Sequence, residues 1–272
     1  MNSLLRLTIW MTIIMAFLLI AAYAFKESQS VVVVKTSYKD TLLPAHFCLI
    51  KGPQRKPEPL IEAVSDRNYV WDKKILNVYF WEKDEWGVFN KILQVASEWT
   101  PHSGIKFTRV YNRNESDIRV SLKTQGFWSY IGSYAEKISK DKITLSLDRI
   151  YLPQNESRFR NVILHEFGHA LGLIHELQHP ELKIPWKKKE LFKFFLDTYS
   201  VDSNWVNKQV IDKYNSISGI YCKPDPASVM IYAIPEGLTE NNAFVADWPD
   251  SLSALDKKYI GPICKHKRCE NR

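Results

Sequence analysis

The sequence predicts a fold of mixed strands and helices, of the α/β or α+β class. Three observations support this prediction. The 272-residue chain is 45% apolar and 25% charged, which is ordinary for a globular protein and allows one large domain or two lobes. Segments with strand-like alternation surround a segment of helical periodicity between residues 75 and 122. A longer helical pattern follows, from residue 158 to about residue 172.

The elements of the first half begin with a strand. Residues 75–81, ILNVYFW, alternate and are rich in residues that favour strands. Residues 87–100 place apolar side chains at helical spacing, and Pro101 follows the end of this pattern. Further strands are predicted at residues 104–111, 116–122 and 142–150. The second of these three alternates apolar and polar residues, as a half-buried strand would.

The second half is predicted to be mainly helical. The long helix that starts near Arg158 stops near Gly172, and beyond His175 the patterns are weaker. Residues 185–199 and 205–214 are compatible with helices. Residues 251–263 resemble a closing helix, with Ser251 or Ser253 as its N-cap.

The first 25 residues differ from the rest of the chain. Arg6 is followed by an uncharged apolar run from Leu7 to Phe25, and Ala22-Tyr23-Ala24 fits a small-x-small cleavage site. We expect residues 1–24 to be a secretory signal peptide. The alternative is a signal anchor that attaches the protein to a membrane through residues 7–25. Both alternatives predict an extracytoplasmic location, either secreted or in the periplasm or cell envelope.

The charge and the cysteines give weaker indications. The net charge is +7, but its clusters are short and no nucleic-acid motif accompanies them, so we expect no nucleic-acid partner. Residues 25–65 are typical of an N-terminal extension or connector, and residues 265–272 form a basic C-terminal tail. In an oxidising compartment the four cysteines would pair as disulfides, and three pairings remain open among Cys48, Cys222, Cys264 and Cys269.

Four of the seven histidines fall between His165 and His179. His165 and His169 are four residues apart, so on a helix they share one face and can bind one zinc ion. Gly172 tolerates a left-handed backbone and can end the helix sharply, which would return His175 to the same metal. Three histidines leave one coordination position open, as a catalytic zinc requires.

Glu166 is adjacent to the first of these ligands. A carboxylate beside the metal, rather than on it, is where a general base is needed to take a proton from the attacking water. His179 lies four residues beyond His175, but Pro180 follows it. We expect His179 to be a surface histidine or a neighbour of the ligands rather than a ligand.

The spacing His165-Glu166-x-x-His169-x-x-Gly172-x-x-His175 resembles the signature of the metzincin zinc metalloproteases. SVMIY at residues 228–232 is similar to their methionine turn, and Tyr232 matches the zinc-side tyrosine that marks the astacin family. Further segments, at residues 117–122, 126–135, 226–239 and 252–260, resemble the bacterial and fungal astacin-like metallopeptidases. The resemblance extends from about Cys48 to Ile263.

The resemblance implies a fold and an activity. The fold would be α+β, a two-lobed catalytic domain at residues 66–264. A mixed twisted sheet and the active-site helix would form the N-terminal lobe to about residue 175, followed by a mostly irregular and helical C-terminal lobe. The activity would be that of a zinc-dependent metalloendopeptidase with one catalytic Zn²⁺ and peptide or protein substrates. The alternative is a catalytically silent protein in which zinc braces a peptide-binding cleft; the oligomeric state stays open.

The resemblance also implies roles for individual residues. His165, His169 and His175 would bind zinc, and Glu166 would act as general base and then pass the proton to the leaving amine. Tyr232 would ligate zinc at rest and move off to stabilise the oxyanion. Met230 would form an apolar floor beneath the metal, and Glu176 would make a buried polar contact. Residues 116–122 would be the edge strand that aligns the substrate, and residues 128–130 would lie at the cleft or in the core. Residues 234–239 would set the substrate preference.

Overall fold

The computed structural model describes residues 48–51, 69–84, 87–148, 156–213 and 223–264. The predicted signal peptide or anchor, most of the connector at residues 25–65 and the tail at residues 265–272 lie outside these ranges. The same is true of the side chains of all four cysteines. Within the described ranges, no helix combines the length and apolarity that crossing a bilayer would need.

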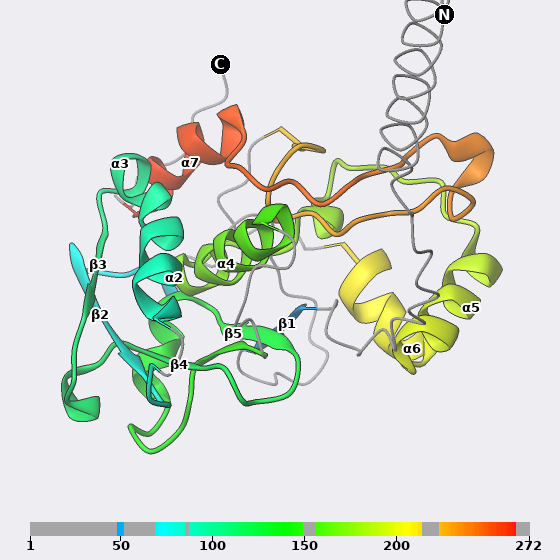
Figure 1. The fold of residues 1–272 in the computed structure, drawn as a ribbon. Coiled ribbons are helices and arrows are strands. Elements are labelled where there is room, and N and C mark those ends of the chain that lie inside the picture. The colour runs from blue at the N-terminus through cyan, green and yellow to red at the C-terminus, as the bar shows by residue number, and fades with distance from the viewer. Residues whose placement is uncertain (1–47, 52–68, 85–86, 149–155, 214–222, 265–272) are drawn as a thin grey trace, which may run out of the picture. The chain divides into compact units, whose positions relative to one another are not determined.

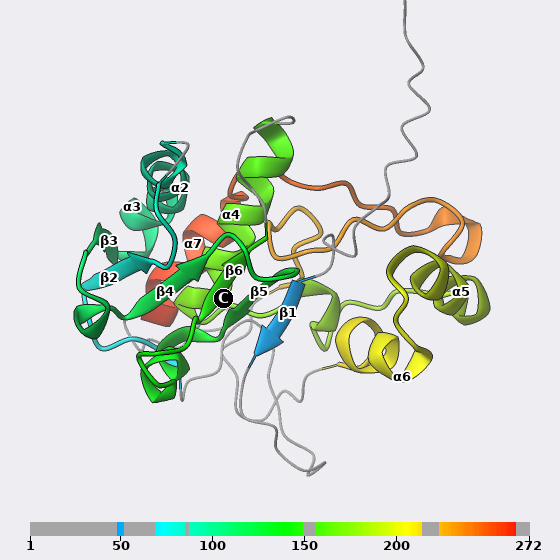
Figure 2. The same cartoon turned by 60° about the horizontal axis from the view of Figure 1, so that its bottom comes forward.

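A single mixed sheet of six strands organises the N-terminal part of the described chain. Its order is β1-β5-β6-β4-β2-β3, and every neighbouring pair is parallel except β5 and β6. Figure 2 shows this order from β3 to β1 across the sheet. The strands are β1 (Cys48–Lys51), β2 (Ile75–Phe80), β3 (Lys106–Arg109), β4 (Ile118–Ser121), β5 (Phe127–Tyr130) and β6 (Leu145–Leu147).

The strand at residues 116–122 is found, but two expectations about it are wrong. β4 lies between β6 and β2, so it is not an edge strand. It is also buried on both faces, because its polar side chains find partners inside the protein. The guanidinium of Arg119 donates to the carbonyls of Lys142 and Ala135, at 2.6 Å and 3.0 Å, and the hydroxyl of Ser121 donates to a carboxylate.

The region predicted as an irregular connector contains the strand β1. β1 pairs with β5 in parallel, with Cys48 opposite Phe127 and Lys51 opposite Tyr130. β1 and β3 are therefore the two outermost strands of the described sheet.

Two helices cover one face of this sheet (Figure 1). They are α2 (Val88–Ala96) and α4 (Glu156–Leu171). The helical segment was predicted to end before Pro101, but it continues to Ser103. A 3₁₀ turn, η2 (Ser97–Trp99), and a short helix, α3 (Thr100–Ser103), follow α2 directly. Pro101 lies in the first turn of α3, where a missing N–H costs little. The indole of Trp99 donates to the carbonyl of Leu164 at 3.0 Å and joins this segment to α4.

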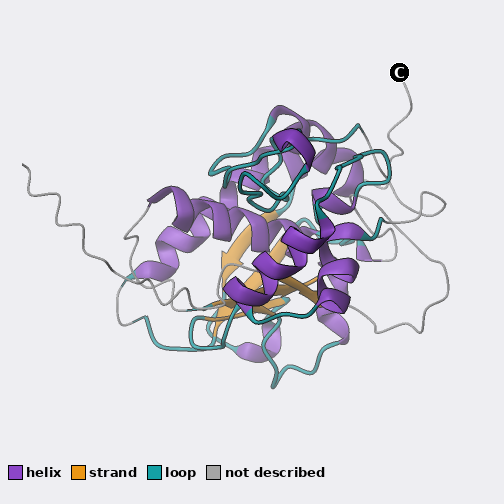
Figure 3. Cartoon of the chain, turned by 90° about the vertical axis from the view of Figure 1, so that its right-hand side faces the viewer, coloured by secondary structure: helices purple, strands orange, loops and turns teal. Residues whose placement is uncertain are grey.

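The part of the chain after α4 has no long strands among its described residues, and helices and loops make up most of it (Figure 3). It contains a second apolar cluster, separate from the one under the sheet, built around Leu177, Phe195 and Val210. Further helical segments of the fold are η3 (Arg113–Glu115), η4 (Gly132–Lys137), η5 (Glu176–Gln178), α5 (Lys188–Tyr199), α6 (Ser203–Val206), the π-helical η6 (Asn207–Ile211), η7 (Glu240–Asn242) and α7 (Ala254–Cys264).

The closing helix α7 begins where the sequence placed it, and Ser253 rather than Ser251 caps it. The hydroxyl of Ser253 accepts from the amide of Asp256 at 2.8 Å, and Oδ2 of Asp256 accepts from the amide of Ser253 at 3.0 Å. These reciprocal bonds satisfy two donors at the start of the helix. They also hold the carboxylate of Asp256 in the interior, where it accepts hydrogen bonds from Ser228 and Val229.

Candidate metal centre

Helix α4 carries the first two histidines in the interior of the protein. From Phe159 to Leu171 every residue of the helix is buried except Arg160, so the polar side chains of this stretch lie in the interior together with the apolar ones. His165 and His169 stand one turn apart, and their ring centroids are 4.7 Å apart.

The helix ends at Gly172 as the sequence predicts. Gly172 has φ +108°, a conformation that residues with a side chain rarely adopt, and its amide bonds to the carbonyl of His169 at 2.8 Å. The amide of Leu173 reaches back to the carbonyl of Gly168 at 3.0 Å. This turn reverses the chain within a few residues and returns His175 to the helix.

The three histidines converge on one point. Nε2 of His169 lies 3.1 Å from Nε2 of His165 and 3.1 Å from Nε2 of His175. One ligand atom from each residue lies within 4.8 Å of the others, and no other such group of three is found among the described residues. All three side chains are at most 3% exposed.

This arrangement fits a zinc ion. Two nitrogens that are each about 2.0–2.1 Å from a tetrahedral ion lie about 3.3 Å from one another, close to the distances seen here. Three neutral imidazoles are also the donor set of one class of catalytic zinc sites. The residues therefore hold the positions that zinc requires, and leave one position for a water or a substrate.

Backbone carbonyls set the tautomers of two ligands. Nδ1 of His165 donates to the carbonyl of Val229, and Nδ1 of His169 donates to that of Leu173, both at 2.7 Å. A carbonyl can only accept, so the proton is on Nδ1 and the lone pair of Nε2 faces the shared point. Such contacts to the outer nitrogen orient ligands and raise metal affinity.

The electrostatic surroundings keep the imidazoles neutral. Burial lowers the pKa of His165 to about 4, although its bond to Val229 acts in the opposite direction. Burial, together with the neighbouring imidazoles, also places the pKa values of His169 and His175 well below the ordinary value. Neutral imidazoles bind a cation without first losing a proton.

Met230, the residue of the methionine turn expected to form an apolar floor beneath the metal, is buried against helix α4. Met230 is 2% exposed, and a Cβ atom on Gly168 would come within 2.5 Å of its sulfur, so the glycine makes room for the thioether. Tyr232 lies in the same turn. Its hydroxyl is 2.7 Å from Nε2 of His175, at the edge of the ligand cluster.

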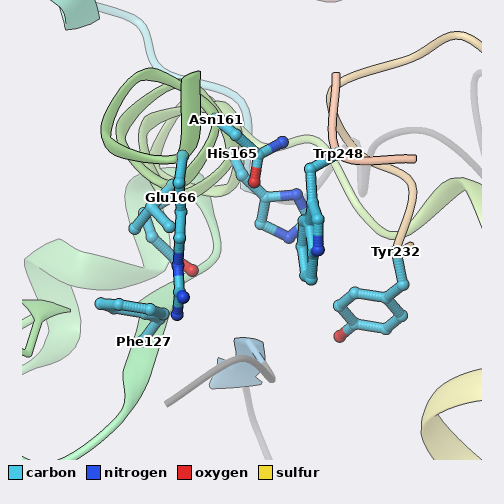
Figure 4. Close-up of a pocket in the computed structure, with 8 residues that line it drawn as sticks. Phe127, Asn161, His165, Glu166, Tyr232 and Trp248 are labelled. Carbon is cyan, nitrogen blue, oxygen red and sulfur yellow. The ribbon is translucent and has the colours of Figure 1, made fainter. Parts of the chain in front are cut away.

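Glu166 lines a pocket beside His165. The pocket encloses about 320 Å³, including the part that opens to solvent. Three apolar residues, Phe127, Val162 and Trp248, form much of its wall, and Arg158, Asn161, His165, Glu166 and Tyr232 complete it. Figure 4 shows side chains from α4, β5 and the methionine turn meeting around this space.

A chain of hydrogen bonds links the metal centre to α7. Asp256 accepts from the hydroxyl of Ser228 at 2.7 Å and from the amide of Val229 at 3.0 Å. The carbonyl of Val229 in turn holds His165. Burial, with the nearby Asp225 also contributing, raises the pKa of Asp256. This carboxylate therefore orients a metal ligand without touching the metal.

The remaining predicted residues are placed as follows. Glu176 makes the buried polar contact expected of it, accepting from the amide of Asp225 at 2.7 Å, and burial raises its pKa to about 8. His179 is outside the ligand cluster as expected, but it is buried rather than on the surface, and its Nδ1 accepts from the amide of Glu181 at 3.1 Å. Of residues 128–130, Trp128 is buried in the core.

Sequence reasoning missed the residues that shape the pocket. Residues 234–239, expected to set substrate preference, do not line it, whereas Phe127, Arg158, Asn161 and Trp248 do. Asn161 and Arg158 lie one and two turns before His165 on α4, so helical spacing alone could have placed them on its side. Nothing in the sequence brings Trp248 to the same place, because it depends on the path of a long loop.

Comparisons with known proteins found one matching family and several similar structures. The sequence model of the peptidase family described as Astacin matches residues 63–234. A solved structure of myroilysin has a TM-score of 0.67 and 29% identity, covering 73% of this chain and 96% of its own. A second, titled as the crystal structure of myroilysin, has a TM-score of 0.57 and 26% identity, covering 82% and 92%.

A more distant structure is the high choriolytic enzyme 1, a hatching enzyme zinc-protease from the medaka fish Oryzias latipes. It has a TM-score of 0.49 and 15% identity, and the match covers 74% of this chain and 96% of the other. No curated protein sequence matches the chain significantly.

Proposed function

The chain belongs to the astacin family, whose members are zinc metalloendopeptidases, and from this we propose that it hydrolyses peptide bonds with Glu166 as general base. The observation that carries the proposal is the convergence of His165, His169 and His175 beside this carboxylate. A structural zinc site would add a fourth histidine, cysteine or carboxylate ligand, and none joins these three histidines among the described residues.

The bound zinc ion would polarise the scissile carbonyl and lower the pKa of a water molecule toward about 7. Glu166 takes the proton from the attacking water and passes it to the leaving amine. The hydroxyl of Tyr232 donates to the oxyanion as it forms, and its place at the edge of the cluster, 2.7 Å from His175, supports this role. The backbone carbonyls that accept from Nδ1 of His165 and His169 fix the orientation and the tautomer of both rings.

We propose that residues 66–264 form the catalytic domain and that it works outside the cytosol. The signal-like residues 1–24 support export, and the uncharged run at residues 7–25 leaves membrane attachment as the alternative. N-terminal sequencing of the mature protein separates the two. A terminus near residue 25 supports cleavage, and an intact residue 1 supports the anchor.

The test of the activity is hydrolysis of a mixed peptide library by the zinc-loaded protein. We expect cleavage that stops on addition of a chelator and returns when zinc is restored. Cleavage that persists after complete removal of metal would contradict the proposal. So would a zinc-loaded, folded protein that leaves every peptide of the library intact.

A further inference from the structure

Asn161 is a buried polar residue in the wall of the pocket beside the metal centre. Asn161 is 1% exposed, and its Nδ2 donates to the carbonyl of Pro249 at 2.6 Å. Because only the nitrogen of the amide can donate to a carbonyl, this bond fixes the orientation of the side chain. The other end, Oδ1, has no hydrogen-bond partner among the described residues.

This oxygen belongs to the pocket that adjoins the catalytic centre. Asn161 lines the same space as His165 and Glu166. Figure 4 shows Oδ1 of Asn161 turned toward the side of the pocket where the ring of His165 stands, and the nitrogen turned away from it. A buried acceptor without a partner costs free energy in the free protein, and a donor that enters the pocket recovers it.

The rest of the pocket limits what that donor can be. Phe127, Val162 and Trp248 offer apolar walls, which suit the methylene groups of a side chain. Arg158 and Glu166 place one charge of each sign around the same pocket, so it favours neither a cationic nor an anionic side chain. The donor is therefore neutral. A carboxamide fits this site, since it is neutral and its NH₂ group donates to Oδ1 of Asn161.

We propose that Asn161 is a specificity-determining residue, and that this pocket selects the carboxamide side chain of glutamine or asparagine next to the scissile bond. The inference rests on the proposed peptidase function and adds the substrate class. It predicts that the enzyme distinguishes substrate side chains of similar size by whether they can donate a hydrogen bond to Asn161. Sites that bond a polar group of the substrate reject an analogue of the same shape that lacks it, because the protein atom is then left unpaired.

The test uses peptides that are identical except at one position, and it scans both positions flanking the scissile bond. At each position the residue is Gln, Glu, Met, Ser or Lys. Gln, Glu and Met have similar lengths, but of these only Gln carries a neutral donor. We expect the wild-type protein to cleave the Gln peptide with a kcat/KM about tenfold higher than the Met or Glu peptide at one of the two positions.

The variant Asn161→Leu removes the acceptor and keeps a side chain of similar size. We expect its Gln-to-Met ratio to fall to within about twofold, mainly because the Gln peptide loses rate. Val162→Ala is the matched control, since it changes the neighbouring apolar wall. It alters the rates of all peptides and keeps the Gln-to-Met ratio. Asn161→Ser, which withdraws the acceptor from the pocket, gives a second variant if Asn161→Leu fails to fold, as judged by zinc content and thermal unfolding.

Three results would overturn the inference: equal cleavage of the Gln and Met peptides by the wild-type protein at both positions, a preference for the Ser hydroxyl over Gln, or an unchanged Gln-to-Met ratio in folded Asn161 variants. Failure of the underlying function looks different. In that case the zinc-loaded wild-type protein cleaves none of the peptides.

Discussion

The backbone of Val229 joins a metal ligand to a buried carboxylate. Its carbonyl accepts from Nδ1 of His165 at 2.7 Å, and its amide donates to Asp256 at 3.0 Å. The methionine turn is therefore hydrogen-bonded to α7 through Asp256 and to α4 through His165. A disturbance at Asp256 should reach the metal centre through a single residue.

We expect Asp256→Asn to weaken zinc binding by about 10- to 100-fold. An amide offers one accepting oxygen where the carboxylate accepts from Ser228, Val229 and Ser253, so a buried donor loses its partner. Competition with a fluorescent chelator measures the affinity. Asp197→Asn, on the exposed side of α5, is the matched control and should leave zinc affinity unchanged. Equal affinities for the two variants would show that Asp256 does not orient the ligand.

The raised pKa of Asp256 gives a pH-dependent effect on stability. In the unfolded chain this carboxyl has the ordinary pKa of 3.8, and burial raises the value in the folded protein. The folded state then binds the proton more tightly, so its stabilising contribution is complete below pH 3.8 and is lost as the pH rises through the native pKa.

The free energy of unfolding of the zinc-free wild type should therefore fall, relative to zinc-free Asp256→Asn, from about pH 4 toward neutrality. Urea denaturation of both proteins at a series of pH values in the presence of a chelator measures this difference. A difference that stays constant across the series contradicts the expected titration.

Glu166→Gln should reduce kcat by about 10²- to 10⁴-fold, because the amide cannot accept a proton from water. The substitution conserves size at a side chain that is 1% exposed, so zinc content and fold should be retained. Steady-state hydrolysis and metal analysis of the same preparation check both points. Glu156→Gln makes the same chemical change at an exposed position of the same helix and should keep wild-type activity. A wild-type rate of hydrolysis by Glu166→Gln would show that Glu166 is not the general base.

Tyr232→Phe should lower kcat by roughly 10²-fold, with a smaller effect on KM, since a donor to the oxyanion acts in the transition state. The hydroxyl lies 2.7 Å from Nε2 of His175, and the ring packs in the apolar cluster of the second part of the chain. Stability should therefore change little. Tyr111→Phe, at a side chain that is 80% exposed, controls for the loss of a hydroxyl. A loss confined to KM would assign Tyr232 to substrate binding instead.

Gly132→Ala should destabilise the protein by several kcal/mol. A Cβ atom there would lie 1.9 Å from the carbonyl oxygen of Tyr69, and this oxygen belongs to backbone that cannot move aside alone. Gly126 is the matched control, because it also has a positive φ but has open space around the Cβ position. Gly126→Ala should cost only the backbone strain, about 1–2 kcal/mol. Thermal unfolding compares the two, and equal losses would show that the contact at Gly132 relaxes.

The elements with strong periodicity were predictable from the sequence. The strands at residues 75–80 and 106–109, the helix at residues 156–171 and the turn at Gly172 are confirmed, since each depends on local spacing. The family and the zinc-binding histidines were predictable for the same reason: His165, His169 and His175 stand within eleven residues of one another.

What escaped prediction depends on contacts between distant segments. β4 alternates like a half-exposed strand, but the backbone carbonyls of residues 135–142 cover Arg119, and sequence spacing gives no sign of such a cover. The strand β1 forms only because β5 provides a partner. Asn161 is an ordinary helical residue until Pro249, 88 residues later, fixes its amide.

The parallel pairing of β1 with β5 leaves no free strand edge on the outer side of β5, beside the pocket. β5 is the strand that supplies Phe127 to the pocket, and residues 48–51 already occupy the backbone groups along its outer side. A peptide that extends the sheet there must displace a segment tethered to the same chain, whose effective concentration is on the order of millimolar. We expect long peptides to bind at a rate limited by the departure of that segment, and short ones, which do not pair with β5, to escape this limit.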